Sequence, residues 1–149
     1  MNIAIIGSGS WATALAKIVM HNATDINWYI RKQETIDEFM EIRRNPNHLE
    51  WAYFDVSRIH FSADINAVIE QSDLLVLAVP SPYLKQSLND IKVDMSQKMV
   101  ISAVKGMIPD ENLLVTEYMH KHFNVPVENL GVIAGPCHAE EIALERLSY

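Results

Sequence analysis

Cysteine, basic charge and long apolar runs are all scarce in this sequence. Cys137 is the only cysteine, which excludes an intrachain disulfide and a multi-cysteine metal site and fits a reducing compartment. The 12 basic residues are outnumbered by 19 acidic ones, for a net charge of -7. Nucleic acid and anionic membranes are therefore not expected as main partners, because phosphates require clustered basic side chains.

Targeting and membrane-spanning segments are also missing. No basic residue precedes Lys17, the opening apolar run is too short for a signal sequence, and the run 74–79 is far shorter than a membrane span. We therefore expect a cytoplasmic protein.

Short apolar runs recur along the 149 residues, which are 49% hydrophobic. This length suits a single domain with a proper core. Runs without polar alternation are typical of strands buried on both faces of a parallel sheet. The predicted strands are 3–6, 26–30, 59–61, 74–79, 99–104 and 131–134. The predicted helices are 10–22, 34–44, 64–71, one opening at Pro82, 112–123, and one beginning at about His138. The pattern predicts an α/β fold, a doubly wound and mostly parallel sheet of the Rossmann type.

The first strand runs directly into Gly7-Ser8-Gly9-Ser10 and then into an alanine-rich helix. Two glycines allow a tight turn and a close approach of backbone to ligand, and Ala12 takes the third small position of a dinucleotide-binding fingerprint. A helix N-terminus offers free N–H groups and partial positive charge to a pyrophosphate. The sequence therefore predicts a dinucleotide site here, against the alternative of a plain glycine-rich turn.

The second predicted strand ends in Arg31-Lys32, where an acidic residue would select the free 2′-hydroxyl of NAD. The Arg31 guanidinium can bind a 2′-phosphate with two hydrogen bonds or stack on adenine. This favours NADP slightly over NAD as the cofactor. The alternative is a solvated basic pair before the next turn.

Two later strand ends lie at the same carboxyl edge, where open α/β sheets bind ligands. Val79 ends the fourth predicted strand, Pro80 and Ser81 follow it, and Ser81 either contacts ligand or caps the helix that follows. Lys105 follows the fifth strand, where its charge suits a phosphate or a reacting oxygen. The alternative for Lys105 is an exposed loop lysine.

Other residues favour structural roles. The helix 34–44 is predicted to face Ile36, Phe39, Met40 and Ile42 inward. The aromatic residues of the loop 45–55 are expected to cover the sheet edge, and His60 has no second metal-type residue at useful spacing, so no metal site is predicted.

Four segments together are similar to bacterial NAD(P)-dependent glycerol-3-phosphate dehydrogenase, in order and spacing along the whole chain. These segments are Gly7 to Ala16 with Trp11 after the turn, Val79-Pro80-Ser81, Val104-Lys105-Gly106, and Ala134 to Glu141 with Gly135-Pro136-Cys137-His138. The resemblance implies hydride transfer between NAD(P)H and dihydroxyacetone phosphate, giving sn-glycerol 3-phosphate for phospholipid synthesis.

The resemblance also implies roles for individual residues. With the glycines of the turn, the implied cofactor-binding set is Gly7, Gly9, Ser10, Trp11, Arg31, Lys32, Lys105 and Ala139. The implied substrate-binding set is Lys105, Gly135 and Cys137. Three positions depart from the family: Ala12 replaces a glycine, Cys137 replaces a serine or threonine, and the loop 45–55 lacks a Leu-Pro step.

Family members carry a second, helical domain whose lysine is the general acid and base. This chain stops at Tyr149, inside its last predicted helix, so we expect an amino-terminal NAD(P)-binding domain that is inactive alone. For the longer enzyme, a homodimer stays open as the assembly. Two alternatives remain: a stand-alone dinucleotide-sensing module, and a related hydroxyacid or ketopantoate-type reductase.

Overall fold

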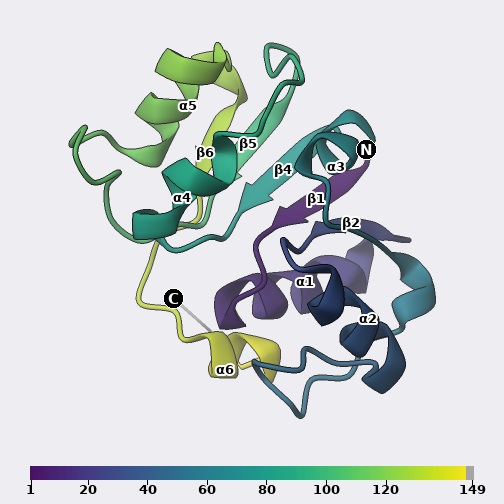
Figure 1. Cartoon of the computed structure of the whole chain (residues 1–149). Coiled ribbons are helices and arrows are strands. Elements are labelled where there is room, and N and C mark those ends of the chain that lie inside the picture. Colours follow the sequence, from purple (N-terminus) through teal and green to yellow (C-terminus); the bar gives the residue numbers. More distant parts are fainter. Residues whose placement is uncertain (147–149) are drawn as a thin grey trace.

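The computed structural model describes residues 1–146, which form one parallel sheet with helices on both faces (Figure 1). The strands are β1 (Ile3–Ile6), β2 (Ile26–Tyr29), β3 (Ile59–Ser62), β4 (Leu74–Leu77), β5 (Met99–Ser102) and β6 (Leu130–Val132). The α-helices are α1 (Ser10–Asn22), α2 (Gln33–Ile42), α3 (Ile65–Glu70), α4 (Ser81–Leu88), α5 (Val115–Phe123) and α6 (Ala139–Ala143). Two short 3-10 turns are η1 (Val56–Arg58) and η2 (Val127–Asn129).

The strands lie in the order β3-β2-β1-β4-β5-β6, and every pairing is parallel. This order is that of the doubly wound dinucleotide-binding fold, so the predicted fold class is confirmed. The chain reverses its direction of travel across the sheet between β1 and β4. At such a switch point the loops after β1 and β4 lead to opposite faces of the sheet. Their separation opens a crevice at the carboxyl ends of these strands.

Alternate residues of the central strands belong to two hydrophobic cores, one on each face of the sheet. Ile6 packs with residues of α3, α4 and α5, whereas Ile5 packs with residues of α1 and α2. Both isoleucines are at most 1% exposed, which explains why β1 shows no polar alternation. On the second face, α6 packs along α1 (Figure 1), so the chain crosses the carboxyl edge of the sheet after β6.

Several predicted boundaries and orientations are wrong. Met40 is 52% exposed, whereas Ile36 and Phe39 are buried as predicted. Helix α5 begins at Val115 rather than 112, because the left-handed backbone of Asn112 and an Ile108–Leu113 bridge form a tight turn before it. The second, fourth, fifth and sixth strands end before the predicted residue, although the N–H of the next residue still donates to the neighbouring strand in each case.

Helix α6 is shorter than predicted. Glu145 adopts a left-handed conformation at φ 59°, and the Arg146 N–H returns to the Glu141 carbonyl at 3.0 Å. This pattern terminates a helix, so within the described residues α6 ends at Ala143. Tyr149, where the last helix was expected to continue, lies outside the described residues. Among residues 1–146, no helix has the length and apolar character needed to cross a membrane.

Candidate functional site

The turn after β1 requires glycine at one position and leaves open space at another. Gly7 has φ +129°, and a Cβ there would lie 2.6 Å from the Ala78 carbonyl oxygen of the neighbouring strand end. A side chain at Gly9 would meet no atom within 4 Å. Gly7 therefore allows β1 and β4 to approach closely, while Gly9 keeps the space above the turn free for a ligand.

Helix α1 begins directly at this turn with its N-terminus uncapped. Gly9 is the N-cap, and no side chain bonds to the first turn, which also carries no acidic residue. Among residues 1–146, the N–H groups of Ser10 and Trp11 donate to no protein acceptor. These N–H groups and the helix dipole are what an anion such as a pyrophosphate requires.

A hollow of about 610 Å³ opens over this N-terminus at the switch point. Its lining comes from the ends of β1, β4 and β5 and from the start of α6, and consists of Gly9, Ser10, Trp11, His48, Ala78, Val79, Pro80, Ser81, Pro82, Ala103, Val104, Lys105 and Ala139. The hollow thus collects five predicted cofactor-binding residues that are up to 130 positions apart in the sequence, from Gly9 to Ala139.

Two smaller hollows adjoin the central one and share lining residues with it. One of about 280 Å³ contains Arg31 and Tyr83 and shares Gly9 and His48. The other, of about 300 Å³, contains Gly135 and shares lining residues from the β5 end. The three hollows lie side by side along the carboxyl edge and share lining residues, and we call them together the edge groove.

Lys105, Trp11 and Cys137 meet at one end of the edge groove. The Lys105 Nζ donates to the Cys137 carbonyl oxygen at 3.0 Å and lies 5.9 Å from the centre of the Trp11 ring. The Trp11 Nε1 donates to the Ala103 carbonyl at 2.8 Å. The structure therefore brings the predicted lysine and cysteine together, although the contact to Cys137 uses its backbone and not its thiol.

Gly135 and Ala139 flank Cys137 in the segment that crosses from β6 to α1. Gly135 has φ +145°, a backbone conformation that residues with a side chain rarely adopt, and it lines the 300 Å³ hollow. Ala139 opens α6 and lines the 610 Å³ hollow. The half-buried Cys137 is a free thiol beside them. All three residues predicted from this segment thus face the edge groove.

Arg31 and Lys32 follow β2 and have different surroundings. Arg31 lines the 280 Å³ hollow beside Tyr29, whose pKa is raised by burial and lowered in part by the Arg31 charge. Lys32 is the N-cap residue of α2 and lines none of the three hollows of the edge groove. The structure thus places Arg31, but not Lys32, in the edge groove.

Ser81 does not cap helix α4. Pro80 occupies the N-cap position and no side chain bonds to the first turn, so Ser81 is the first helical residue. Ser81 lines the 610 Å³ hollow; the sequence left ligand contact and capping both open for this residue.

Four residues that the sequence did not indicate also reach the site: Thr13, Trp28, Asn45 and His48. The first three bond to the glycine turn, and His48 lines two hollows of the edge groove. Asn45 and His48 belong to the predicted loop 45–55, whose contribution to the site could not be judged from the sequence. An asparagine directly after a helix and before proline was the available signal, but it indicated a helix break.

The loop that follows Lys105 is held by Glu111. Its carboxylate accepts from Lys85 at 3.0 Å and lies 2.7 Å from the His122 Nε2, joining the loop to α4 and α5. The hydrogen bond from Lys85 is the largest cause that lowers the pKa of the Glu111 carboxyl, and the hydrogen bond from His122 is the second. This ion cluster fixes the far end of the segment that positions Lys105.

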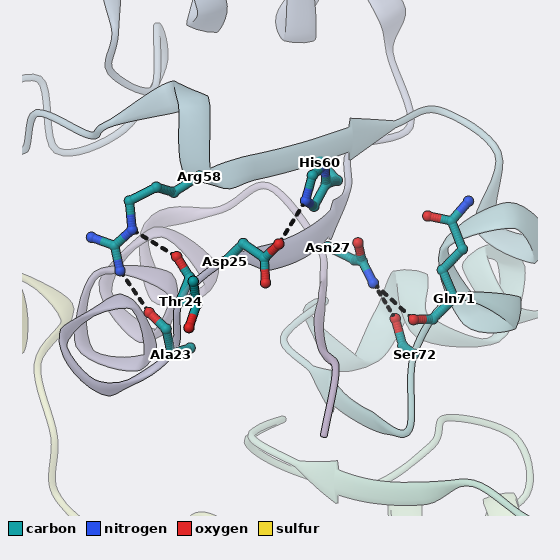
Figure 2. A network of polar contacts seen from close by, with 8 residues as sticks. All are labelled: Ala23, Thr24, Asp25, Asn27, Arg58, His60, Gln71 and Ser72. Atoms are coloured by element: carbon teal, nitrogen blue, oxygen red, sulfur yellow. Dashed lines mark hydrogen bonds and ion pairs between the residues drawn. The ribbon is translucent and has the colours of Figure 1, made fainter.

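A different hollow, of about 330 Å³, lies at the opposite, amino edge of the sheet. Figure 2 shows its polar groups pairing among themselves: His60 lies 2.9 Å from Asp25, and Asn27 donates to Ser72 and to the Gln71 carbonyl. In the part of the chain that the structure describes, no group of three or more His, Cys, Asp or Glu could hold a metal ion.

Comparison with known proteins gives consistent matches. A family model described as "NAD-dependent glycerol-3-phosphate dehydrogenase N-terminus" matches residues 2–149. Glycerol-3-phosphate dehydrogenase (NAD(P)+) of Geobacillus kaustophilus is 31% identical over 144 residues, which are 96% of this chain and 42% of that protein. The enzyme of the same name from Staphylococcus epidermidis is 30% identical over 146 residues, 97% of this chain and 44% of that protein.

Solved structures agree with the sequence matches. Glycerol-3-phosphate dehydrogenase of Plasmodium falciparum superposes with a TM-score of 0.84 at 29% identity, covering 99% of this chain and 44% of that one. The enzyme from Coxiella burnetii gives a TM-score of 0.79 at 24% identity, covering 96% and 43%, and supports the fold. The chain thus spans less than half the length of these relatives.

Proposed function

The chain belongs to the NAD-dependent glycerol-3-phosphate dehydrogenase family, and on that premise we propose that its edge groove binds NADP or NAD in an extended form. The observation that carries this proposal is the uncapped N-terminus of α1 behind Gly7 and Gly9, which opens into a hollow of about 610 Å³. The residues present fit the cofactor: the free N–H groups of Ser10 and Trp11 suit its pyrophosphate.

The two ends of the edge groove suit the two ends of the cofactor. Arg31 would bind the adenosine ribose and a 2′-phosphate if present, which favours NADP slightly. Lys32, at the α2 N-cap, would add positive charge nearby without lining the groove. Trp11, Lys105 and Ala139 would hold the nicotinamide half in the central hollow.

Substrate binding would occur where Lys105, Gly135 and Cys137 converge. We propose that this end takes the phosphorylated alcohol or ketone, dihydroxyacetone phosphate or sn-glycerol 3-phosphate. The Lys105 ammonium would release the Cys137 carbonyl and bind a phosphate or carbonyl oxygen of the substrate, and the Gly135 backbone would allow a close approach. The nicotinamide supplies or accepts the hydride, while the residues of the chain contribute position and charge.

Turnover is proposed for the complete enzyme and not for residues 1–149 alone, because the relatives are more than twice as long. In the proposed arrangement, a second domain supplies the general acid and base, and phospholipid synthesis in the cytoplasm uses the product. A stand-alone sensing module and a ketopantoate-type reductase are not favoured, since the matched family and relatives are glycerol-3-phosphate dehydrogenases.

Calorimetric titration of the 149-residue chain tests this function directly. We expect saturable binding of NADPH and NADH, and no heat beyond dilution with a dinucleotide-free control such as glucose 6-phosphate. In the same samples, dihydroxyacetone phosphate should not accelerate NADPH oxidation. Ordinary dehydrogenase turnover by this chain would refute the need for a second domain, and absence of any dinucleotide binding would refute the proposed function itself.

A further inference from the structure

Three consecutive carbonyl oxygens of the glycine turn, those of residues 7–9, each accept a side-chain hydrogen bond, two from distant segments and one from the first turns of α1. The pairs are Trp28 Nε1 to Gly7 O at 2.7 Å, Asn45 Nδ2 to Ser8 O at 2.9 Å, and Thr13 Oγ1 to Gly9 O at 2.9 Å. Trp28 comes from β2 and Asn45 from the loop after α2. The carbonyls are thereby directed into the protein.

Asn45 is the centre of this arrangement. It is 0% exposed, and its Nδ2 donates both to the Ser8 carbonyl and, at 2.8 Å, to Thr13 Oγ1. Since the Thr13 hydroxyl receives this bond, its own proton is free for the Gly9 carbonyl. The Asn45 Oδ1 accepts the Asn47 N–H at 2.9 Å, which orients the amide. Asn45 therefore sets the Ser8 carbonyl directly. It also fixes the Thr13 hydroxyl beside the Gly9 carbonyl, which accepts the Thr13 N–H at 3.0 Å as the first backbone hydrogen bond of α1.

An anion at the α1 N-terminus is repelled by any carbonyl oxygen that turns toward it and attracted by free N–H groups. We propose that Asn45 is a positioning residue for the pyrophosphate of the dinucleotide, which it never touches. It acts by holding the Ser8 carbonyl away from the groove and by fixing the Thr13 hydroxyl that bonds to the Gly9 carbonyl, so that the N–H groups of the first turn face the ligand. This inference rests on the proposed function.

Asn27 provides a matched control within the same chain. It is 7% exposed, and its Nδ2 likewise donates to one backbone carbonyl, of Gln71 at 3.2 Å, and to one hydroxyl, of Ser72 at 2.8 Å. Figure 2 shows this pairing, and Asn27 and Gln71 line the hollow at the amino edge, whereas the glycine turn follows the carboxyl end of β1. Asn27→Asp and Asn45→Asp therefore make the same chemical change in similar burial at opposite edges of the sheet.

The test compares NADPH affinity in the two variants, with 2′-AMP as a ligand that lacks the pyrophosphate. Asn45→Asp loses one oriented hydrogen bond and places an acceptor against the Ser8 carbonyl. Its affinity for NADPH should therefore fall roughly tenfold or more. Asn27→Asp should change NADPH affinity by less than about twofold, because Asn27 lines no part of the edge groove. Binding of 2′-AMP should be equal in both variants and the wild type.

Three results would overturn the inference: equal NADPH affinity in Asn45→Asp and wild type, equal losses in both variants, or a loss for 2′-AMP as large as that for NADPH. If Asn45→Asp does not fold, Thr13→Val and Thr13→Ser replace it. Thr13→Ser keeps the hydroxyl bond to Gly9 and should restore the affinity that Thr13→Val loses, and equal affinities of these two would contradict the role. A wild type that binds no NADPH would instead reject the proposed function.

Discussion

The two glycines of the turn should fail in opposite ways when each is replaced by alanine. In Gly7→Ala the new Cβ would lie 2.6 Å from the Ala78 carbonyl oxygen, and φ +129° would be strained as well. Backbone strain of about 1–3 kcal/mol and overpacking of about 1–3 kcal/mol add to roughly 2–6 kcal/mol of lost stability. For a chain of this size, the melting temperature should fall by roughly 3 °C for each kcal/mol.

Gly9→Ala is the matched comparison, because Gly9 has an ordinary φ of -76° and no atom within 4 Å of a built Cβ. The fold should melt within a few degrees of wild type, but the methyl group would occupy the ligand's space, so NADPH affinity should fall roughly tenfold or more. Differential scanning calorimetry and NADPH titration on both variants separate the two effects. A Gly7→Ala variant that melts like wild type, or a Gly9→Ala variant that binds like it, would refute this division of roles.

Three further changes test other parts of the site. Arg31→Ala should weaken NADPH by the roughly 1.5–3 kcal/mol of a charge-assisted hydrogen bond and leave NADH nearly unchanged; equal losses in titrations of both cofactors would mean that Arg31 does not bind the 2′-phosphate. Lys105→Met should leave the melting temperature unchanged, because the side chain is exposed, and in the complete enzyme should lower kcat/KM by roughly two to three orders of magnitude; near-normal kinetics would make it a surface lysine. Because the folded pKa of Glu111 lies below its ordinary 4.5, its ion cluster should stabilise the fold above pH 4.5 and lose that effect as the pH falls through the lowered pKa. The melting temperature of Glu111→Gln should therefore lie below that of wild type at pH 7 and converge with it in acid. A difference in melting temperature that stays constant with pH would contradict this.

The sheet and the glycine turn could be predicted because their signals are local. Strand β1 must be apolar on both sides, since Ile5 and Ile6 face different cores, and that leaves an uninterrupted run in the sequence. The expected strand order then placed the turn, Ser81 and Lys105 at one edge, as observed. Site residues that directly follow a strand can therefore be predicted from the sequence, because the strand order brings the strand ends to one edge.

The support for the turn could not be predicted, because it depends on segments that fold back from elsewhere. Asn45 and Trp28 lie 37 and 21 positions from the residues whose carbonyls they bind, and neither spacing has a local signature. Met40 was assigned to the core by helical period, yet that face of α2 meets solvent. The cofactor role of Lys32 was implied by the family resemblance; in the structure Lys32 is the N-cap residue of α2 and lies outside the hollow that Arg31 lines.

The central claim is that a dinucleotide binds along the carboxyl edge with its pyrophosphate at the N-terminus of α1. Titrating the ¹⁵N-labelled chain with NADPH and following the backbone amide resonances tests this most directly. The account predicts saturable shifts at Ser10, Trp11 and Arg31, and none at Asn27 or Gln71 on the amino edge. Saturable shifts confined to the amino edge, or no saturable shift at Ser10 and Trp11, would contradict it.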